Sequence, residues 1–165
     1  IYDTGNYQIG DTLSTRKETL FFEPLPTFPP ELFALVTPKD TMKAKQFQKG
    51  VSQLAQEGAI QVYRNEYNEV IIGAVGQLQF EVFQYRLENE YNAKIRMDRL
   101  EFSLARWVHA EDFDTVKKML DSRTMLVFDH FDRPLILFAN QFTLNYFVEK
   151  NPDIKLLEAL DVKQF

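Results

Sequence analysis

The sequence contains no cysteine among its 165 residues, which excludes disulfide bonds and cysteine-ligated metal sites. It has only two histidines and six glycines. No apolar run approaches the roughly 20 residues that a membrane-spanning helix needs, and no charged-then-apolar leader marks secretion. These features fit a cytoplasmic protein without disulfides.

The motifs of common enzyme chemistry are missing as well. The sequence has no H-E-x-x-H metal motif, no G-x-S-x-G nucleophile turn and no G-x-x-x-x-G-K-[ST] phosphate loop. His109 and His130 have no second ligand at helical spacing, so they are interpreted as surface or capping residues. We therefore predict that this chain is not an enzyme and has no catalytic, metal-binding or cofactor-binding residues.

Apolar and aromatic residues, by contrast, are plentiful. Hydrophobic residues make up 45% of the chain and charged residues 26%, with 15 Phe, 7 Tyr and 1 Trp. This composition is typical of a folded domain with a well-packed core. The net charge is −5, whereas proteins that bind nucleic acid along their whole surface are usually basic. Any contact with RNA must therefore be made by a local basic patch.

The first thirty residues differ from the rest. The sequence starts abruptly at Ile1 in what reads as a strand, and a short β-like stretch runs from Tyr7 to Leu13. Residues 21–30 contain four prolines, which disfavour helix and central strand alike. We expect a piece of a longer protein. Residues 1–22 are predicted to be a remnant of a preceding β-barrel domain, 23–30 a linker, and 31–165 a C-terminal α+β domain.

From residue 31 the periodicity alternates between strand and helix. Strands are predicted at 31–37, 59–64, 70–75 and 93–98, with helices from an Asp40 cap to 57 and from Gly76 to 91. The expected buried stripes are Ala44, Phe47, Val51 and Leu54 on the first helix and Phe80, Phe83, Leu87 and Tyr91 on the second. This order predicts an α+β fold, an α/β sandwich with a ferredoxin-like βαββαβ core.

The last third extends this core by further β-α-β elements. We predict strands at 100–108, 125–128, 135–139 and 154–157, a helix at 112–120, and a helix from an Asn140 cap to 150 that places Phe142 and Phe147 at core spacing. The strand–cap–Gln–apolar pattern occurs both at 72–78 and at 136–142. An old duplication, or simply two helices that each follow a strand, would produce it.

Two sequence features could bind a partner. The loop from Gly73 to Gly76 lies between a strand and a helix, where free backbone N–H groups can hold an anion; the alternative is that these glycines permit close packing. The first helix and its approach carry two lysine pairs spaced i, i+4, namely Lys39 with Lys43 and Lys45 with Lys49. Such a basic surface suits an RNA backbone or an acidic protein, or it is an ordinary solvated face.

A second, more scattered basic set follows further along the chain. It consists of Arg96, Arg99 and Arg106, and the Arg106 stem has the alternative role of covering core. Arg64 follows Tyr63, an arrangement that RNA-binding sheets use for stacking.

Several segments together resemble a known family. Residues 73–83 (GAVGQLQFEVF) and 86–92 (RLENEYN) are similar to the strand–helix segment of domain III in bacterial translational GTPases. Elongation factors of that family carry G-x-G-E-L-H-L-E, whereas Gln77, Gln79 and Phe80 stand here as in the release factor 3 branch. Residues 8–12 resemble the last strands of domain II. The resemblance is dense from 30 to 108 and thins beyond 110.

This resemblance implies that the intact protein is a GTPase that promotes departure of the class I release factor in translation termination. GTP or GDP and Mg would bind only in a preceding domain. The chain itself would dock on the ribosome, on rRNA and ribosomal proteins, and relay the nucleotide state through its own GTPase and β-barrel domains. The class I release factor would be an indirect partner, and neither membrane nor DNA is expected.

The candidate ribosome-contacting residues are Lys39, Lys43, Lys45, Lys49, Arg64, Arg96 and Arg99. The alternative function is a ferredoxin-like small phosphatase or a ligand-binding module, motivated by the Gly73–Gly76 loop.

Overall fold

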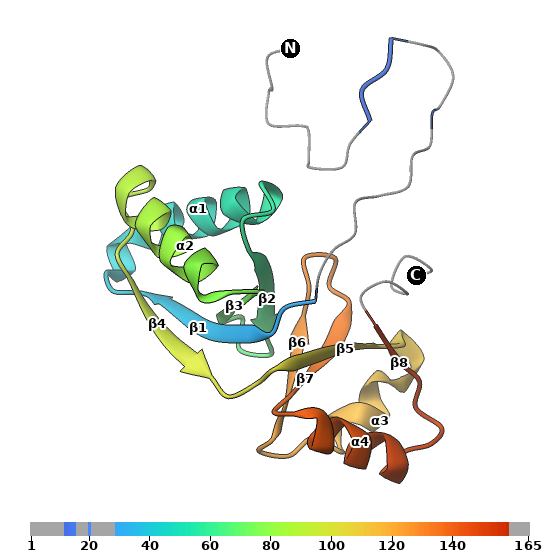
Figure 1. Ribbon diagram of the computed structural model, residues 1–165. Helices are drawn as coiled ribbons and strands as arrows, with labels where there is room; N and C mark the ends of the chain where they lie inside the picture. Colours follow the sequence, from blue (N-terminus) through green and yellow to red (C-terminus); the bar gives the residue numbers. More distant parts are fainter. Residues whose placement is uncertain (1–11, 16–19, 21–28, 159–165) are drawn as a thin grey trace.

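A computed structural model describes residues 12–15, 20 and 29–158 (Figure 1). Over these residues, antiparallel strands form one sheet in the order β4-β1-β3-β2-β6-β7-β5-β8. The strands are β1 Leu32–Pro38, β2 Gln61–Asn65, β3 Val70–Ala74, β4 Ile95–Leu100, β5 Leu104–Val108, β6 Thr124–Phe128, β7 Pro134–Phe138 and β8 Leu156–Leu157. With its helices, this sheet confirms the α+β class.

The predicted barrel remnant and linker lie almost entirely outside the described residues. Only residues 12–15, 20, 29 and 30 of that region are described. The division of the chain into 1–22, 23–30 and 31–165 stays a prediction.

The first half of the sheet has the element order expected from the sequence. Between β1 and β4 the chain forms a 3-10 turn at Thr41–Lys43, helix α1 (Ala44–Gln56), strands β2 and β3, and helix α2 (Gln77–Glu90). Both helices cover one face of the four strands (Figure 1). The ferredoxin-like assignment itself stays a prediction.

Helix α1 begins and ends as its capping residues predict. Asp40 Oδ1 accepts a hydrogen bond from the Met42 backbone N–H at 2.9 Å, and Gly58, just after the last turn, has φ of 68°, a left-handed conformation that glycine adopts without strain. Phe47, Val51 and Leu54 are buried as expected. Ala44 is exposed, so the predicted stripe begins one turn too early, because the chain enters the helix through the 3-10 turn.

Helices α1 and α2 approach closely at Gly50. A Cβ built on Gly50 would lie 2.5 Å from Leu87 Cδ2 and 2.8 Å from Tyr91 Cγ. Both neighbours pack in the core beneath α1 and α2. Leu87 is fully buried there, and Tyr91, the residue after α2, is partly buried. A hydrogen at this position therefore sets the spacing between the helices.

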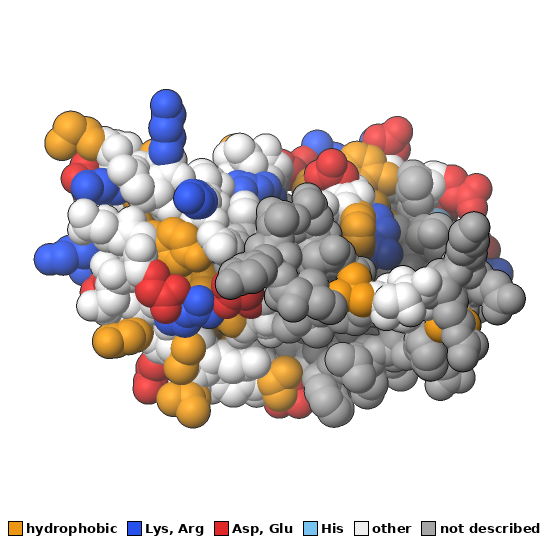
Figure 2. Space-filling view, turned by 90° about the horizontal axis from the view of Figure 1, so that it is seen from above, with side chains coloured by type: hydrophobic (Ala, Val, Ile, Leu, Met, Phe, Trp, Pro, Cys, Tyr) orange, Lys and Arg blue, Asp and Glu red, His pale blue; other side chains and the backbone are white. Residues whose placement is uncertain are grey.

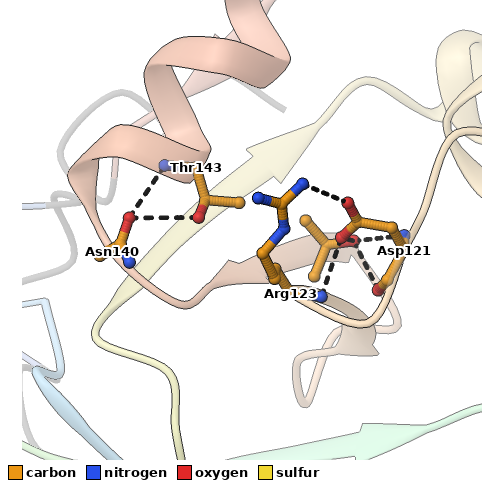
Figure 3. Close-up of polar contacts among 5 residues, drawn as sticks. Asp121, Arg123, Asn140 and Thr143 are labelled. Atoms are coloured by element: carbon orange, nitrogen blue, oxygen red, sulfur yellow. Dashed lines mark hydrogen bonds and ion pairs between the residues drawn. The ribbon is translucent and has the colours of Figure 1, made fainter.

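The second half of the sheet carries its own two helices, α3 (Phe113–Lys117) and α4 (Gln141–Lys150). Asn140 caps α4: its Oδ1 accepts hydrogen bonds from Thr143 N at 2.9 Å and from Thr143 Oγ1 at 3.1 Å (Figure 3). Phe147 is buried, but Phe142 is 71% exposed. These two residues are five apart, about 140° around a helix, so they cannot both face the core.

Three predicted elements of this half are interrupted or shorter than expected. The strand at 100–108 is interrupted, because β4 ends at Leu100 and β5 starts at Leu104. The helix at 112–120 is a 3-10 turn at Ala110–Asp112 followed by the five residues of α3, and the last strand is only Leu156–Leu157.

A shared core joins the two halves. Phe33, Tyr63 and Ile71, on the face of the first half opposite its helices, pack with residues of the second half, namely Ala105, Trp107, Val127, Leu135 and Leu137. An ion pair between Lys117 of α3 and Glu66 of the β2–β3 turn also links the halves. The helices thus lie on the outside and the two parts of the sheet face each other.

A buried carboxylate holds the β6–β7 hairpin. Asp129 is 8% exposed, and its Oδ2 accepts from Trp107 Nε1 at 3.1 Å and from Arg133 Nε at 2.8 Å. Its Oδ1 accepts from the backbone N–H groups of Phe131 and Arg133. Burial alone raises the pKa of Asp129, but the bonds from Arg133, Trp107 and the backbone outweigh it and leave this pKa below its ordinary value.

We predict that this pKa makes the stability of the domain depend on pH. Because the folded-state pKa of Asp129 is lowered, its contribution is present above the unfolded pKa of about 3.9 and is lost as pH falls through the lower folded value. The difference in Tm between the wild-type chain and Asp129→Asn should be constant from neutral pH down to about pH 5 and shrink below about pH 4. Thermal unfolding followed by circular dichroism would measure it, and a difference that persists unchanged at about pH 2 would contradict the assignment.

Candidate functional site

The outward face of α1 is a basic, acid-free surface. Phe47, Val51 and Leu54 point into the core, so Lys45, Lys49, Ser52 and Gln56, spaced i, i+4, i+7 and i+11, line the opposite side, and all four are exposed. The remaining exposed positions between Ala44 and Gln56 are Ala44 itself and glutamines. We call Lys39, Lys43, Lys45 and Lys49 the lysine surface.

The charges of the lysine surface do not stabilise the helix. The first turn of α1 contains no acidic residue, and cations near a helix N-terminus oppose the helix dipole. Lys45 and Lys49 are a like-charge i, i+4 pair, which costs a few tenths of a kcal/mol. Among the described residues, no carboxylate lies within ion-pair distance of these four lysines. Their charge is thus available to an external anion.

The sheet adds a fifth lysine that the site prediction did not include. The Lys39 backbone N–H donates to the Lys94 backbone oxygen at 2.9 Å, where the end of β1 meets the start of β4. Both residues are exposed. Only the pairing of two strands distant in sequence reveals this neighbour, so spacing alone could not have found it.

Arg64 borders the lysine surface from the sheet. Its Nη2 donates to Gln48 Oε1 of α1 at 2.7 Å, and its Nη1 donates to the side-chain and backbone oxygens of Asn68 in the β2–β3 turn. Arg64 therefore fixes the turn to the helix and adds a positive charge beside it.

Arg96 and Arg99 do not form one surface. Ile95 and Met97 of β4 face the helices, so by alternation Arg99 lies on the helix side and Arg96 on the other. Arg99 stacks over the Phe80 ring at 4.2 Å, whereas Arg96 pairs with Asp98 at 2.9 Å. Arg106, on the second half, pairs with Glu158. The structure places Lys45, Lys49 and Arg64 on or beside α1 but does not gather this second set.

The Gly73–Gly76 loop is already occupied by a side chain. Gln79 Oε1 accepts from Val75 N at 2.7 Å and from Gly76 N at 3.4 Å, which takes the N–H groups that an anion would need. A Cβ on Gly73 would lie 2.9 Å from Pro30 and 3.0 Å from Tyr63. The contacts favour close packing over a phosphate site, and with it they disfavour the phosphatase alternative.

Other kinds of site find little support in the described part of the chain. No group of three or more histidines, aspartates or glutamates gathers there in a way that could hold a metal ion. No helix among those residues has the length and apolar character to cross a membrane.

Comparison with known proteins gives a consistent family. Residues 22–148 match the family described as class II release factor RF3, C-terminal domain. The chain is 55% identical over 161 residues to peptide chain release factor 3 of Listeria welshimeri, which covers 97% of this chain and 30% of that relative. It is 52% identical to the protein of the same name from Streptococcus uberis, again over 97% of this chain and 31% of the relative.

The chain spans about 30% of the length of the curated relatives it matches. The family match includes α1, α2, the lysine surface and most of α4. Since this match extends over more than half of the sequence, the chain belongs to the family of class II release factor RF3 C-terminal domains.

Proposed function

We propose that this chain is a ribosome-docking and interdomain-relay domain of a class II release factor GTPase. The intact protein would promote dissociation of class I release factors in translation termination in the cytoplasm. Relatives named peptide chain release factor 3 support the general role. The observation that carries the docking role is the outward face of α1, which presents Lys45 and Lys49 and no acidic residue, on a chain with a net charge of −5.

The chemistry of this surface matches an RNA backbone. Lys45 and Lys49 have no ion-pair partner among the described residues, and phosphate contacts by such ammonium groups position a protein on RNA without reading its sequence. Ser52 and the exposed glutamines can donate and accept hydrogen bonds to phosphate and 2′-hydroxyl groups. Docking thus needs no catalytic residue in this domain, and GTP and Mg would be held by another part of the intact protein.

A relay role would rest on the continuity of the sheet. β2 of the first half pairs with β6 of the second at Arg64 and Asn65, and the shared core around Trp107 lies behind this junction. Because packed sheets move as units, a displacement at the lysine surface would be carried to the second half rather than absorbed between the halves.

Charge reversal on α1 tests the docking role. In the full-length factor that contains this domain, Lys45→Glu with Lys49→Glu should weaken binding to ribosomes by about tenfold or more, because two phosphate contacts become repulsive. Co-sedimentation with ribosomes would measure the affinity. When the concentration of the variant is limiting, it should also release a class I factor from ribosomes more slowly than the wild type does.

The matched control is Lys118→Glu with Lys155→Glu, which has the same charge change on exposed lysines of the second half. It should bind within about twofold of the wild type, since distant surface charges are screened at physiological salt. Equal affinities for the two double variants would contradict the docking role of α1.

A further inference from the structure

Helix α2 carries a second apolar stripe, which faces solvent. Leu78, Val82 and Tyr85 are spaced i, i+4 and i+7 and are 69%, 43% and 67% exposed. Val75, just before the helix, is 46% exposed. The buried stripe of α2 consists of Phe80, Phe83 and Leu87 on the opposite side. The helix is therefore apolar on both sides although only one side packs on the sheet.

Such a helix is unusual on a free surface. An amphipathic helix normally has a polar outer face, and contiguous exposed apolar patches mark interaction sites more often than scattered single residues do. Side chains at i, i+4 and i+7 are the usual anchors when a helix enters a groove on a partner. We call Val75, Leu78, Val82 and Tyr85 the apolar stripe.

The charges beside the apolar stripe select the kind of partner. Glu81 and Glu88 lie along one side of it. On the other side Arg86 forms ion pairs with Glu57 and with Glu90, so its charge is neutralised. An acidic border repels phosphates and favours a surface that carries lysine or arginine.

The apolar stripe lies next to the lysine surface. Figure 2 looks down on the two helices: most Lys and Arg side chains on the left stand in the upper part, over α1, while hydrophobic and acidic side chains follow the lower edge, over α2. The two helices therefore present two neighbouring surfaces: a basic one on α1, and an apolar one with an acidic border on α2.

We propose that the apolar stripe docks into an apolar groove, bordered by lysine or arginine, on a protein of the ribosome. This inference rests on the proposed ribosome-docking function and names a second contact in it. RNA phosphates would contact α1, and a protein would contact α2.

Photocrosslinking in the full-length factor identifies the occupant. A benzophenone amino acid replaces Tyr85, and the factor is irradiated on ribosomes; the control position is Tyr67, 83% exposed in the β2–β3 turn. A crosslink to a ribosomal protein from position 85 and not from position 67 supports the inference. A crosslink to rRNA, to another part of the same polypeptide or to a second copy overturns it, as does equal crosslinking from both positions or none from ribosome-bound factor.

Truncation of the stripe separates this inference from the proposed function. Leu78→Ala with Val82→Ala and Tyr85→Ala should weaken ribosome binding about tenfold, as loss of interface anchors does, and should leave Tm nearly unchanged because these side chains face solvent. Unchanged affinity in this variant, together with weakened binding in the lysine variant, would overturn the stripe and leave the lysine surface standing. Unchanged affinity in both variants would overturn both.

Discussion

Asp129→Ala should lower the free energy of unfolding of this chain by about 3 kcal/mol, because it removes a buried carboxylate that accepts several hydrogen bonds and leaves the buried Trp107 N–H without its acceptor. The carboxylate accepts from the Trp107 indole N–H, the Arg133 guanidinium and two backbone N–H groups. Alanine provides no acceptor for any of them, and each buried donor that loses its partner costs about 1–3 kcal/mol before relaxation. Urea unfolding monitored by Trp107 fluorescence would measure the change.

Two further variants show whether the charge of Asp129 or its hydrogen bonds cause the loss of stability. Asp129→Asn keeps an acceptor but no charge, and should cost about half as much, since charge-assisted hydrogen bonds are about twice as strong as neutral ones. Asp132→Asn removes an exposed carboxylate from the same hairpin and keeps a residue type that tolerates the positive φ of 58° found there. A loss in Asp132→Asn as large as in Asp129→Ala would show that the charge of the hairpin, and not the buried network, is responsible.

Gly50→Val should also destabilise the chain by about 3 kcal/mol, the upper end of the usual cost of overpacking a core. The new Cβ would meet Leu87 Cδ2 at 2.5 Å and Tyr91 Cγ at 2.8 Å. Rotation of the Tyr91 ring about χ2 leaves Cγ in place, and Leu87 is fully buried among its neighbours, so relief of these contacts needs a new χ1 rotamer of Tyr91 or a separation of the helices. Chemical denaturation again gives the measurement.

The matched control for Gly50 is Gly76→Ser. A Cβ at Gly76 would have no heavy atom within 4 Å, and serine is a favoured residue at a helix N-cap. This variant should be neutral or slightly stabilising. A similar loss in both glycine variants would contradict the close helix contact at Gly50.

Local chemistry made the first half of the fold predictable. Asp40 and Gly58 mark the ends of α1, and Phe47, Val51 and Leu54 mark its buried side. The need for glycine at Gly50 was not predictable, because it depends on contacts with α2, almost forty residues later. The second half was harder, since its short α3 and the break between β4 and β5 leave few periods from which to read a pattern.

The candidate site, too, was only partly predictable from the sequence. The Lys45–Lys49 pair could be predicted because its spacing lies within one helix, and alternation along β4 already implies that Arg96 and Arg99 face opposite sides. The proximity of Lys39 to Lys94 requires the pairing of β1 with β4. The stripe on α2 was missed because apolar residues on both sides of a helix hide the exposed ones among the buried ones.

The salt dependence of ribosome binding tests the docking role of α1 most directly. Full-length wild-type factor and its Lys45→Gln, Lys49→Gln variant would be sedimented with ribosomes at several salt concentrations between about 50 and 200 mM. If both lysines contact phosphates, the slope of log affinity against log salt should be shallower by about 2 in the variant, about 1 for each lost contact. Parallel lines for the two proteins would show that neither lysine contacts RNA, and would contradict the proposal.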